Sequence, residues 1–303
     1  MMQPFLHVTS TALGALAIAS TAALTARCRL LCSAAADKLV GRSTEDLLCI
    51  TDFDLTLTAG RSAQCHDVVG QSSRAPAALV AGFAPLLDFS RPFPPEWQAD
   101  GWWEHANSVL VAEGRGIREQ LPAMVRDADM SPRPGALALL QQLADARVPV
   151  LIVSAGYSDI IEEWLKFHRV APADPSLRCI SANRMVFASN GDVAGVTPTR
   201  PITSYSKGRT YARNEAWMSQ HASRRTLLVV GDRLSDLEVI EGAPADIDRV
   251  VRVGIYNDNF KPASPSLEKY RAAFDTVICG DRGSLSPITS LMGTLPAKRR
   301  LIK

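Results

Sequence analysis

The sequence predicts an α/β fold in which a doubly wound, mostly parallel sheet carries an inserted helical cap domain. The first observation behind this is a set of short, nearly continuous aliphatic runs at residues 47–51, 148–153 and 227–230. Such runs are typical of strands buried on both faces, as in a parallel sheet covered by helices. The second observation is that helical patterns separate the runs. The third is a long segment, residues 60–133, that fits neither pattern.

Each aliphatic run leads into polar residues. Asp52 follows the first run, Ser154 follows the second, and Gly231-Asp232 follows the third. In open α/β sheets, ligands bind in the crevice beyond the carboxyl ends of the strands. We therefore expect these polar residues to converge on one site. Two further runs, residues 250–253 and 276–279, are expected to extend the sheet.

Local patterns complete the predicted core. Asn190-Gly191 lies between residues 185–187 and Val193, which is typical of a β-hairpin. A helix is expected from about Arg209 to His221. The apolar runs around Cys49 and Cys279 predict buried thiols for both.

The segment of residues 60–133 is rich in proline and tryptophan and is too long for a connecting loop. We expect it to form a mostly helical cap over the crevice, with residues 37–59 and 134–303 forming the core domain. Residues 1–36 contain no Asp or Glu and are rich in Ala, Ser and Thr. This composition is typical of either an organelle transit peptide or a disordered extension.

The bulk composition excludes several classes of protein. The chain has 303 residues and a formal net charge of only +2, so nothing in it calls for nucleic acid or an anionic membrane as a partner. The six cysteines are scattered, without the paired spacing of a zinc site or the density of a disulfide scaffold. A cytoplasmic location is expected, or an organelle if residues 1–36 act as a transit peptide. The oligomeric state is left open.

Asp52 and Asp54 stand two residues apart at the end of the first predicted strand, where both can face one cavity. Carboxylate oxygens are hard ligands that suit Mg²⁺. One carboxylate can attack phosphorus and form an aspartyl phosphate. The other can protonate the leaving oxygen and then activate water. A solvated turn after a strand is the simpler alternative for this pair taken alone.

Three further elements in chain order favour the chemical interpretation. Ser154-Ala155-Gly156 offers a hydroxyl and backbone N–H groups next to a predicted helix, which suits a phosphate group. Lys207 can neutralise phosphate as a point charge. Asp232 and Asp236 follow the third run, and burying two more acids beside Asp52 calls for a cation.

These motifs resemble those of a known family. Residues 50–57, Ser154-Ala155-Gly156, Asn214 and Gly231-Asp232 are similar to the motifs of the cytosolic 5′-nucleotidase III (pyrimidine 5′-nucleotidase) family, within the haloacid dehalogenase superfamily. The resemblance covers about residues 37–287. It implies a Rossmann-like core and a Mg²⁺-dependent hydrolase that acts on nucleoside 5′-monophosphates.

The resemblance also implies a role for each matching residue. Asp52 is the expected nucleophile and Asp54 the expected acid/base. Mg²⁺ is expected to bind the Asp52 carboxylate, the Asp54 backbone carbonyl and Asp232, with Asp236 in support. The residues expected to bind substrate around the phosphate are Thr56, Ser154, Ala155, Gly156 and Lys207.

Recognition of the base departs from the family pattern. The family's base-reading Glu falls near Leu86 or Leu87, and Asp88 is the nearest acid. Trp102 and Trp103 match the family's aromatic pair; they either stack on a base or pack inside the cap. We therefore expect Asp88, Trp102 and Trp103 to bind the nucleoside, with pyrimidines preferred but a broader base preference than the family's.

Two alternatives remain open from the sequence. The first is a phosphatase of the same chemistry that acts on a sugar or amino-acid phosphate. The second is a non-catalytic nucleotide-binding protein, which predicts the loss of Asp52, Asp54 or Asp232, and all three are present.

Overall fold

The computed structural model describes residues 34–170, 174–257 and 265–296. Most of the predicted N-terminal extension, residues 1–33, lies outside the described residues. The described part of the chain has no helix that is both long and apolar enough to span a bilayer.

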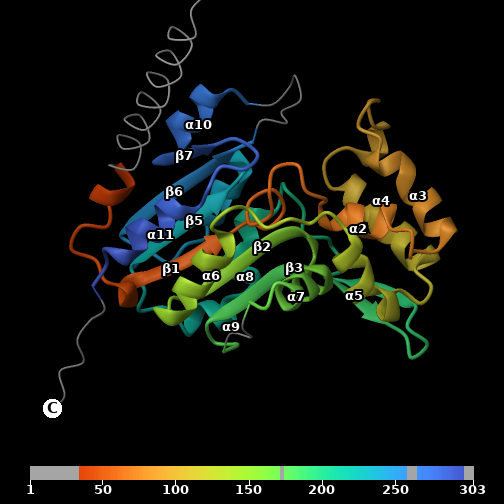
Figure 1. Cartoon of the computed structure of the whole chain (residues 1–303), viewed down its shortest axis with the longest axis horizontal. Helices are drawn as coiled ribbons and strands as arrows, with labels where there is room; N and C mark the ends of the chain where they lie inside the picture. Colours follow the sequence, from red (N-terminus) through yellow and green to blue (C-terminus); the bar gives the residue numbers. More distant parts are fainter. Residues whose placement is uncertain (1–33, 171–173, 258–264, 297–303) are drawn as a thin grey trace, which may run out of the picture.

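A seven-stranded sheet forms the centre of the molecule, in the order β4-β3-β2-β1-β5-β6-β7 (Figure 1). Neighbouring strands run parallel except for the antiparallel pair β3 and β4. The predicted α/β fold with a mostly parallel sheet is confirmed. The strands are β1 (Leu47–Thr51), β2 (Val150–Tyr157), β3 (Arg178–Phe187), β4 (Val193–Thr197), β5 (Thr226–Gly231), β6 (Arg249–Tyr256) and β7 (Thr276–Cys279).

Helices cover both faces of the sheet, which explains the continuous aliphatic runs. In β1, Leu47 and Cys49 pack on one face while Leu48 and Ile50 pack on the other, and all four side chains are buried. The first face is covered by α6 (Ala136–Asp145), α7 (Ser158–Phe167) and α11 (Ser286–Gly293). The second is covered by α8 (Thr210–Arg213), α9 (Glu215–Ser219), η4 (Leu234–Ile240) and α10 (Leu267–Ala273).

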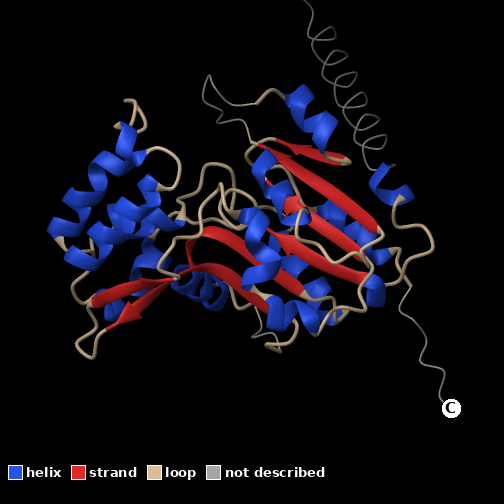
Figure 2. Cartoon of the chain, turned by 180° about the vertical axis from the view of Figure 1, so that it is seen from behind, coloured by secondary structure: helices blue, strands red, loops and turns tan. Residues whose placement is uncertain are grey.

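Four helices, α2 to α5, lie at one end of the molecule beside the sheet (Figures 1 and 2). They are α2 (Cys65–Gln71), α3 (Ala77–Leu87), α4 (Gly101–Glu113) and α5 (Ile117–Asp127), with the short η2 (Pro95–Trp97) between α3 and α4. We propose that residues 60–133 form the cap and the remaining described residues form the core. The β3–β4 hairpin, whose predicted turn at Asn190-Gly191 is confirmed, bonds to these helices through Val193 N and Gly114 O at 2.9 Å.

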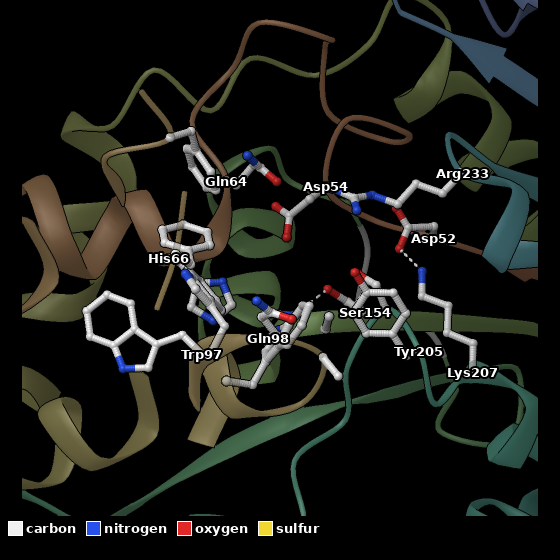
Figure 3. A pocket seen from close by; sticks show the side chains of 18 of the residues that line it. Asp52, Asp54, Gln64, His66, Trp97, Gln98, Ser154, Tyr205, Lys207 and Arg233 are labelled. Atoms are coloured by element: carbon white, nitrogen blue, oxygen red, sulfur yellow. Dashed lines mark hydrogen bonds and ion pairs between the residues drawn. The ribbon is translucent and has the colours of Figure 1, made fainter. Parts of the chain in front are cut away.

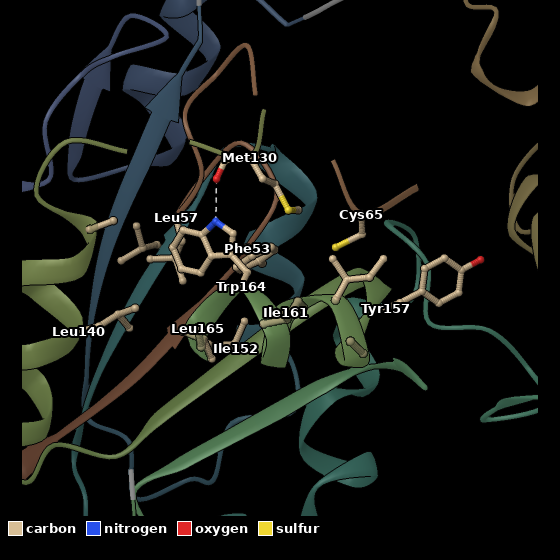
Figure 4. Packing of buried hydrophobic residues seen from close by; sticks show 14 of the residues in the cluster. Phe53, Leu57, Cys65, Met130, Leu140, Ile152, Tyr157, Ile161, Trp164 and Leu165 are labelled. Atoms are coloured by element: carbon tan, nitrogen blue, oxygen red, sulfur yellow. Dashed lines mark hydrogen bonds between the residues drawn. The ribbon is translucent and has the colours of Figure 1, made fainter. Parts of the chain in front are cut away.

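The core beneath the end of β1 is built around Phe53 and Trp164 (Figure 4). Their rings meet edge to face with centroids 5.2 Å apart, and both side chains are fully buried. Trp164 Nε1 also donates to Met130 O at 2.7 Å. Because Phe53 points into the core, its neighbours Asp52 and Asp54 are turned toward the opposite side.

Two predictions about the core are wrong. The Cys279 side chain is exposed, because the strand β7 lies at the edge of the sheet and Cys279 is its last residue. The expected helix over 209–221 is broken into α8 and α9 at Asn214. The Asn214 side chain donates to Thr210 O at 2.8 Å and Ser181 Oγ at 2.9 Å, which fixes the break and ties it to β3.

Candidate active site

Residues at the carboxyl ends of β1, β2 and β5 line one cavity of about 590 Å³: Asp52 follows β1, Asp232 follows β5, and Ser154 lies in the last part of β2. These three strands are neighbours in the sheet, so their carboxyl ends lie side by side. Figure 3 shows the side chains of Asp52, Asp54, Ser154 and Lys207 grouped around this cavity. Of the residues predicted to form the site, the structure brings these together: Asp52, Asp54, Ser154, Ala155, Gly156, Lys207, Asp232, Trp102 and Trp103.

Three carboxylates form an acidic cluster at the base of the cavity. Asp52, Asp232 and Asp236 each offer an oxygen within 4.8 Å of the other two, and all three residues are buried. Asp236, on η4, accepts a hydrogen bond from Arg233 N at 2.8 Å. It packs so closely on Gly231 that a Cβ there would lie 2.2 Å from its carboxylate oxygen, so this position requires glycine.

Lys207 bridges two of the acids. Its Nζ lies 2.6 Å from Asp52 Oδ1 and 2.5 Å from Asp236 Oδ1, and the side chain is almost fully buried. Burial alone would lower the pKa of Lys207, but the carboxylates of Asp236 and Asp52 outweigh it, so the pKa lies above its ordinary value. The ammonium group is therefore positively charged at neutral pH.

The donor set of the cluster fits a divalent cation. Burial, reinforced by Asp52 and Asp236, raises the pKa of Asp232 well above its ordinary value. Among the described residues, no side chain or backbone group is seen donating to the Asp232 carboxylate, while Tyr270 OH donates to its backbone oxygen at 2.5 Å. Carboxylate oxygens are the ligands that Mg²⁺ prefers, and a cation among them would offset their mutual repulsion.

Asp54 lines the cavity outside this cluster. Its Oδ1 accepts a hydrogen bond from Cys65 N, the first residue of α2, at 3.0 Å. Burial, followed by the nearby Asp52 carboxylate, raises the pKa of Asp54 to about 7. A carboxyl group in this state can both donate and accept a proton near neutral pH.

The Ser154-Ala155-Gly156 segment is held by Asn183, a residue that sequence reasoning missed. Asn183 is fully buried on β3. Its Nδ2 donates to Ala155 O at 2.9 Å and to Gly156 O at 3.2 Å. Gly156 N donates to Ser154 Oγ at 2.9 Å. A Cβ on Gly156 would collide with Cys65 at 2.6 Å, so the close approach of α2 depends on this glycine.

The turn after Asp54 depends on another residue that sequence reasoning missed, Arg133. It is buried, and its guanidinium donates to Leu55 O at 2.7 Å, Thr56 O at 2.8 Å and Asn257 Oδ1 at 2.6 Å. Leu55 has a positive φ of 60°, a conformation that is uncommon for leucine and is held here by these bonds. Thr56, predicted to bind substrate, is fully buried in this turn and does not line the cavity.

Aromatic side chains from residues 60–133 line the far end of the cavity. Trp102 is buried and donates from Nε1 to Leu86 O at 3.0 Å, whereas Trp103 is only partly buried. The two rings meet edge to face at 5.2 Å, and Tyr205 from the core meets Trp103 edge to face at 5.9 Å. Sequence reasoning missed the other residues of the 60–133 segment that line the cavity: Gln64, His66, Phe89, Pro92, Phe93, Trp97, Gln98 and Ala99.

The acid expected to read the base lies outside the cavity lining. Asp88 is the residue after α3, and its Oδ1 accepts bonds from Ser90 N at 3.0 Å and Ser90 Oγ at 2.5 Å. It lies next to Phe89, whose side chain does line the cavity.

The sequence profile of the family described as pyrimidine 5′-nucleotidase (UMPH-1) matches residues 95–294. The chain belongs to this family. It is therefore a phosphoric monoester hydrolase of the 5′-nucleotidase type, as the resemblance implied. The match begins inside the helical segment and runs through Ser154, Lys207 and Asp232, so it covers most of the cavity lining.

Individual relatives of the family agree with this assignment. A 7-methylguanosine phosphate-specific 5′-nucleotidase of Gallus gallus is 26% identical over 251 residues, which is 77% of this chain and 82% of the relative. A second, from Xenopus laevis, is 24% identical over 268 residues, or 84% of this chain and 89% of the relative. The fold is similar to that of cytosolic 5′-nucleotidase IIIB bound to cytidine, with a TM-score of 0.66, 18% identity, and coverage of 86% of this chain and 88% of that one.

Proposed function

We propose that this pyrimidine 5′-nucleotidase family member hydrolyses nucleoside 5′-monophosphates to nucleoside and phosphate through an aspartyl phosphate on Asp52. The observation that carries the proposal is the single cavity that joins Asp52, Asp54 and Lys207 at one end to aromatic side chains at the other. These side chains, called the aromatic wall here, belong to Phe89, Phe93, Trp97, Trp102, Trp103 and Tyr205. A nucleoside monophosphate could place its phosphate at the acidic end and its base against the aromatic wall, and would then occupy both ends of the cavity.

Binding of the phosphate group is assigned to two elements. Ser154 and Ala155 supply a hydroxyl and a backbone N–H, in a segment that Asn183 holds in place. Lys207 supplies a buried positive charge 2.6 Å from the Asp52 carboxylate. A charged donor this close to the nucleophile would hold a phosphate oxygen within reach of Asp52 and stabilise charge that develops during transfer.

Mg²⁺ is the proposed cofactor, held by the carboxylates of Asp52 and Asp232 and the backbone oxygen of Asp54, with Asp236 in support. The proximity of the three buried carboxylates supports this assignment. When bound, the ion would neutralise the phosphate and reduce its repulsion of the attacking carboxylate.

The reaction then divides into two steps. Asp52 Oδ attacks phosphorus, the bond from phosphorus to the substrate O5′ breaks, and Asp54 donates a proton to that oxygen. In the second step, Asp54 takes a proton from water, the water oxygen attacks phosphorus, and the bond to Asp52 breaks to release phosphate. The bond from Cys65 N to Asp54 Oδ1 supports this role, because it orients the carboxyl group toward the cavity.

The base is proposed to stack against the exposed side of the aromatic wall, with Trp103 a better candidate than the buried Trp102. Pyrimidines are the preferred base class, with a broader tolerance than the family's.

A second candidate substrate is 7-methylguanosine 5′-monophosphate. It is favoured by the names of the relatives and by the aromatic wall, since a cationic methylated base is attracted to tryptophan faces. A cytoplasmic location is proposed from the structural relative named as cytosolic.

The proposal is tested by comparing kcat/KM, in Mg²⁺, for UMP, CMP, AMP, GMP and 7-methyl-GMP with that for ribose 5-phosphate and phosphoserine. We expect at least one nucleotide to exceed both non-nucleotides by about tenfold or more, since stacking contributes about 1–3 kcal/mol per base. Trp103→Ala should remove that advantage. Asp88→Ala, the matched control outside the cavity lining, should retain it. Equal or better turnover of ribose 5-phosphate or phosphoserine would move the sugar or amino-acid phosphatase alternative ahead.

A further inference from the structure

The loop between β4 and η3 (Lys207–Arg209) contacts the helical segment of residues 60–133 beside the cavity through hydrogen bonds to Asp100, in addition to the ring contact between Tyr205 and Trp103. Thr203 Oγ1 donates to Asp100 Oδ1 at 2.7 Å, and Arg200 Nη2 lies 3.4 Å from Asp100 Oδ2. Thr203 is fully buried, whereas the Arg200 side chain is 61% exposed. The bond from the buried hydroxyl to a carboxylate is therefore the stronger of the two contacts, because an exposed ion pair contributes little.

On the core side, Thr203 is linked to the catalytic lysine by short-range bonds. Its Oγ1 accepts a bond from Tyr205 N at 3.1 Å, and its backbone N donates to Ser206 Oγ at 2.9 Å. Lys207 comes directly after Ser206 and reaches Asp52 and Asp236. A change in the position of Thr203 would therefore move the backbone that carries Lys207.

On the other side, Asp100 immediately precedes α4, which presents Trp102 and Trp103. Trp103 and Tyr205 both line the cavity and their rings meet edge to face, so the two partners of the Asp100–Thr203 bond are each close in sequence to one ring of this pair. Tyr205 lines the same cavity as Ser154 and Lys207, the residues proposed to bind phosphate (Figure 3).

We propose that Asp100 and Thr203 are positioning residues that hold the aromatic wall and Lys207 at a fixed distance from each other. One substrate molecule can then bind the aromatic wall through its nucleoside and Lys207 through its phosphate. This inference rests on the proposed function. It assigns neither residue a contact with substrate. Their effect passes through Trp103 on one side and Lys207 on the other.

Inhibition by inorganic phosphate distinguishes this positioning role from damage to the aromatic wall alone. Inorganic phosphate carries no base, so a variant that only damages the aromatic wall, Trp103→Ala, should raise KM for a nucleotide and leave inhibition by phosphate unchanged. Thr203→Val removes the hydroxyl with little change in shape. It should lower kcat/KM about tenfold or more and weaken phosphate inhibition as well, because Lys207 is displaced too.

The experiment measures kcat, KM and the inhibition constant of inorganic phosphate for wild type, Thr203→Val, Thr203→Ser and Asp100→Ala. Thr203→Ser retains the hydroxyl and should stay within about twofold of wild type. Asp192→Asn is the matched control, because Asp192 accepts a bond from Gly116 N at 2.8 Å and joins the hairpin to the helices away from the cavity. It should leave kcat, KM and the inhibition constant unchanged.

If Thr203→Val and Asp100→Ala turn over the nucleotide and are inhibited by phosphate like wild type, the positioning role is wrong. It is also wrong if they change the nucleotide KM alone, as Trp103→Ala does. Asp100→Ala is the safeguard against misfolding, since the Asp100 side chain is partly exposed and Thr203 is not. Wild type that rejects every nucleotide would overturn the proposed function instead, and the same comparison would then use the phosphomonoester that is hydrolysed.

Discussion

At the scale of single residues, the site depends on side chains that never touch substrate. Phe53 is an example: it lies between the two catalytic candidates and packs against Trp164 in the core. Because successive side chains at the end of β1 alternate in direction, anchoring Phe53 turns Asp52 and Asp54 toward the cavity. Arg133 and Asn183 act similarly: Arg133 holds the turn after Asp54, and Asn183 holds the end of β2.

Asn183 provides a test of this support. Its side chain also donates to Ile202 O and accepts from Ile202 N, so it links the Ser154 segment to the loop that leads to Lys207. Asn183→Leu should leave several buried backbone groups without partners, each costing about 1–3 kcal/mol. We expect the free energy of unfolding to fall by about 3 kcal/mol or more and kcat/KM to fall with it. Asn190→Ala, in the exposed hairpin turn, is the control for urea denaturation. A variant as stable as that control would contradict the supporting role.

At the scale of elements, the sequence predicted the site residues that lie at the carboxyl end of a buried strand. The runs that became β1, β2 and β5 are aliphatic throughout because both of their faces are buried, and this made their ends recognisable. Asp52, Ser154 and Asp232 could therefore be grouped before the structure was known. Lys207 and Asp236 were selected by position in the motif order, and the structure joins them through a direct contact.

The position or role of several other residues could not be predicted from the sequence. Asn183 and Arg133 are single polar residues whose partners are mostly backbone groups distant in the chain, so no local pattern marks them. Asp88 was chosen by proximity to the family's Glu, but α3 ends at Leu87 and the turn that follows directs the Asp88 carboxylate to Ser90. The apolar run of β7 predicted a buried Cys279, although the last residue of an edge strand has a neighbour on one side only.

The meeting of β1, β5 and η4 at one point predicts a requirement for metal. These elements bring Asp52, Asp232 and Asp236 together, and repulsion among buried carboxylates weakens phosphate binding unless a cation is present. Exhaustive treatment with EDTA should lower phosphate release by about a hundredfold or more, and added Mg²⁺ should restore it. Circular dichroism during chelation should show that the fold is retained. Full activity after chelation would rule out the metal site.

At the scale of the whole molecule, the helical segment and the core meet through groups that matter for stability as well as for binding. His66 illustrates this. It is buried between Trp102 and Tyr157, with ring centroids 4.7 and 4.9 Å away. Burial lowers the pKa of His66 to about 3, so the ring is neutral in the folded protein across the physiological range.

This shift predicts a loss of stability in mild acid. The unfolded chain takes up a proton at His66 near its ordinary pKa of about 6.5, whereas the folded protein does so only near 3. The contribution of neutral His66 is thus fully present above pH 6.5 and is lost as the pH falls toward 3. From pH 7 to pH 5 the free energy of unfolding should fall by about 2 kcal/mol from this residue.

Urea denaturation of wild type and His66→Phe at both pH values isolates this contribution. Phenylalanine retains a ring against Trp102 and cannot take up a proton. The difference in stability between pH 7 and pH 5 should therefore be smaller by about 2 kcal/mol in the variant than in wild type. An equal pH dependence in the two proteins would contradict a buried, neutral His66.

Asp52 is proposed to carry the phosphoryl group during turnover of a nucleoside 5′-monophosphate. The most direct test is a single-turnover experiment with the best nucleotide labelled in its phosphate, quenched in acid and followed by peptide mapping. We predict transient label on the peptide that contains Asp52, and neither label nor phosphate release in Asp52→Asn, because an amide cannot attack phosphorus. Sustained release of phosphate by Asp52→Asn, or turnover by wild type with label on no aspartate, would show that Asp52 is not the nucleophile.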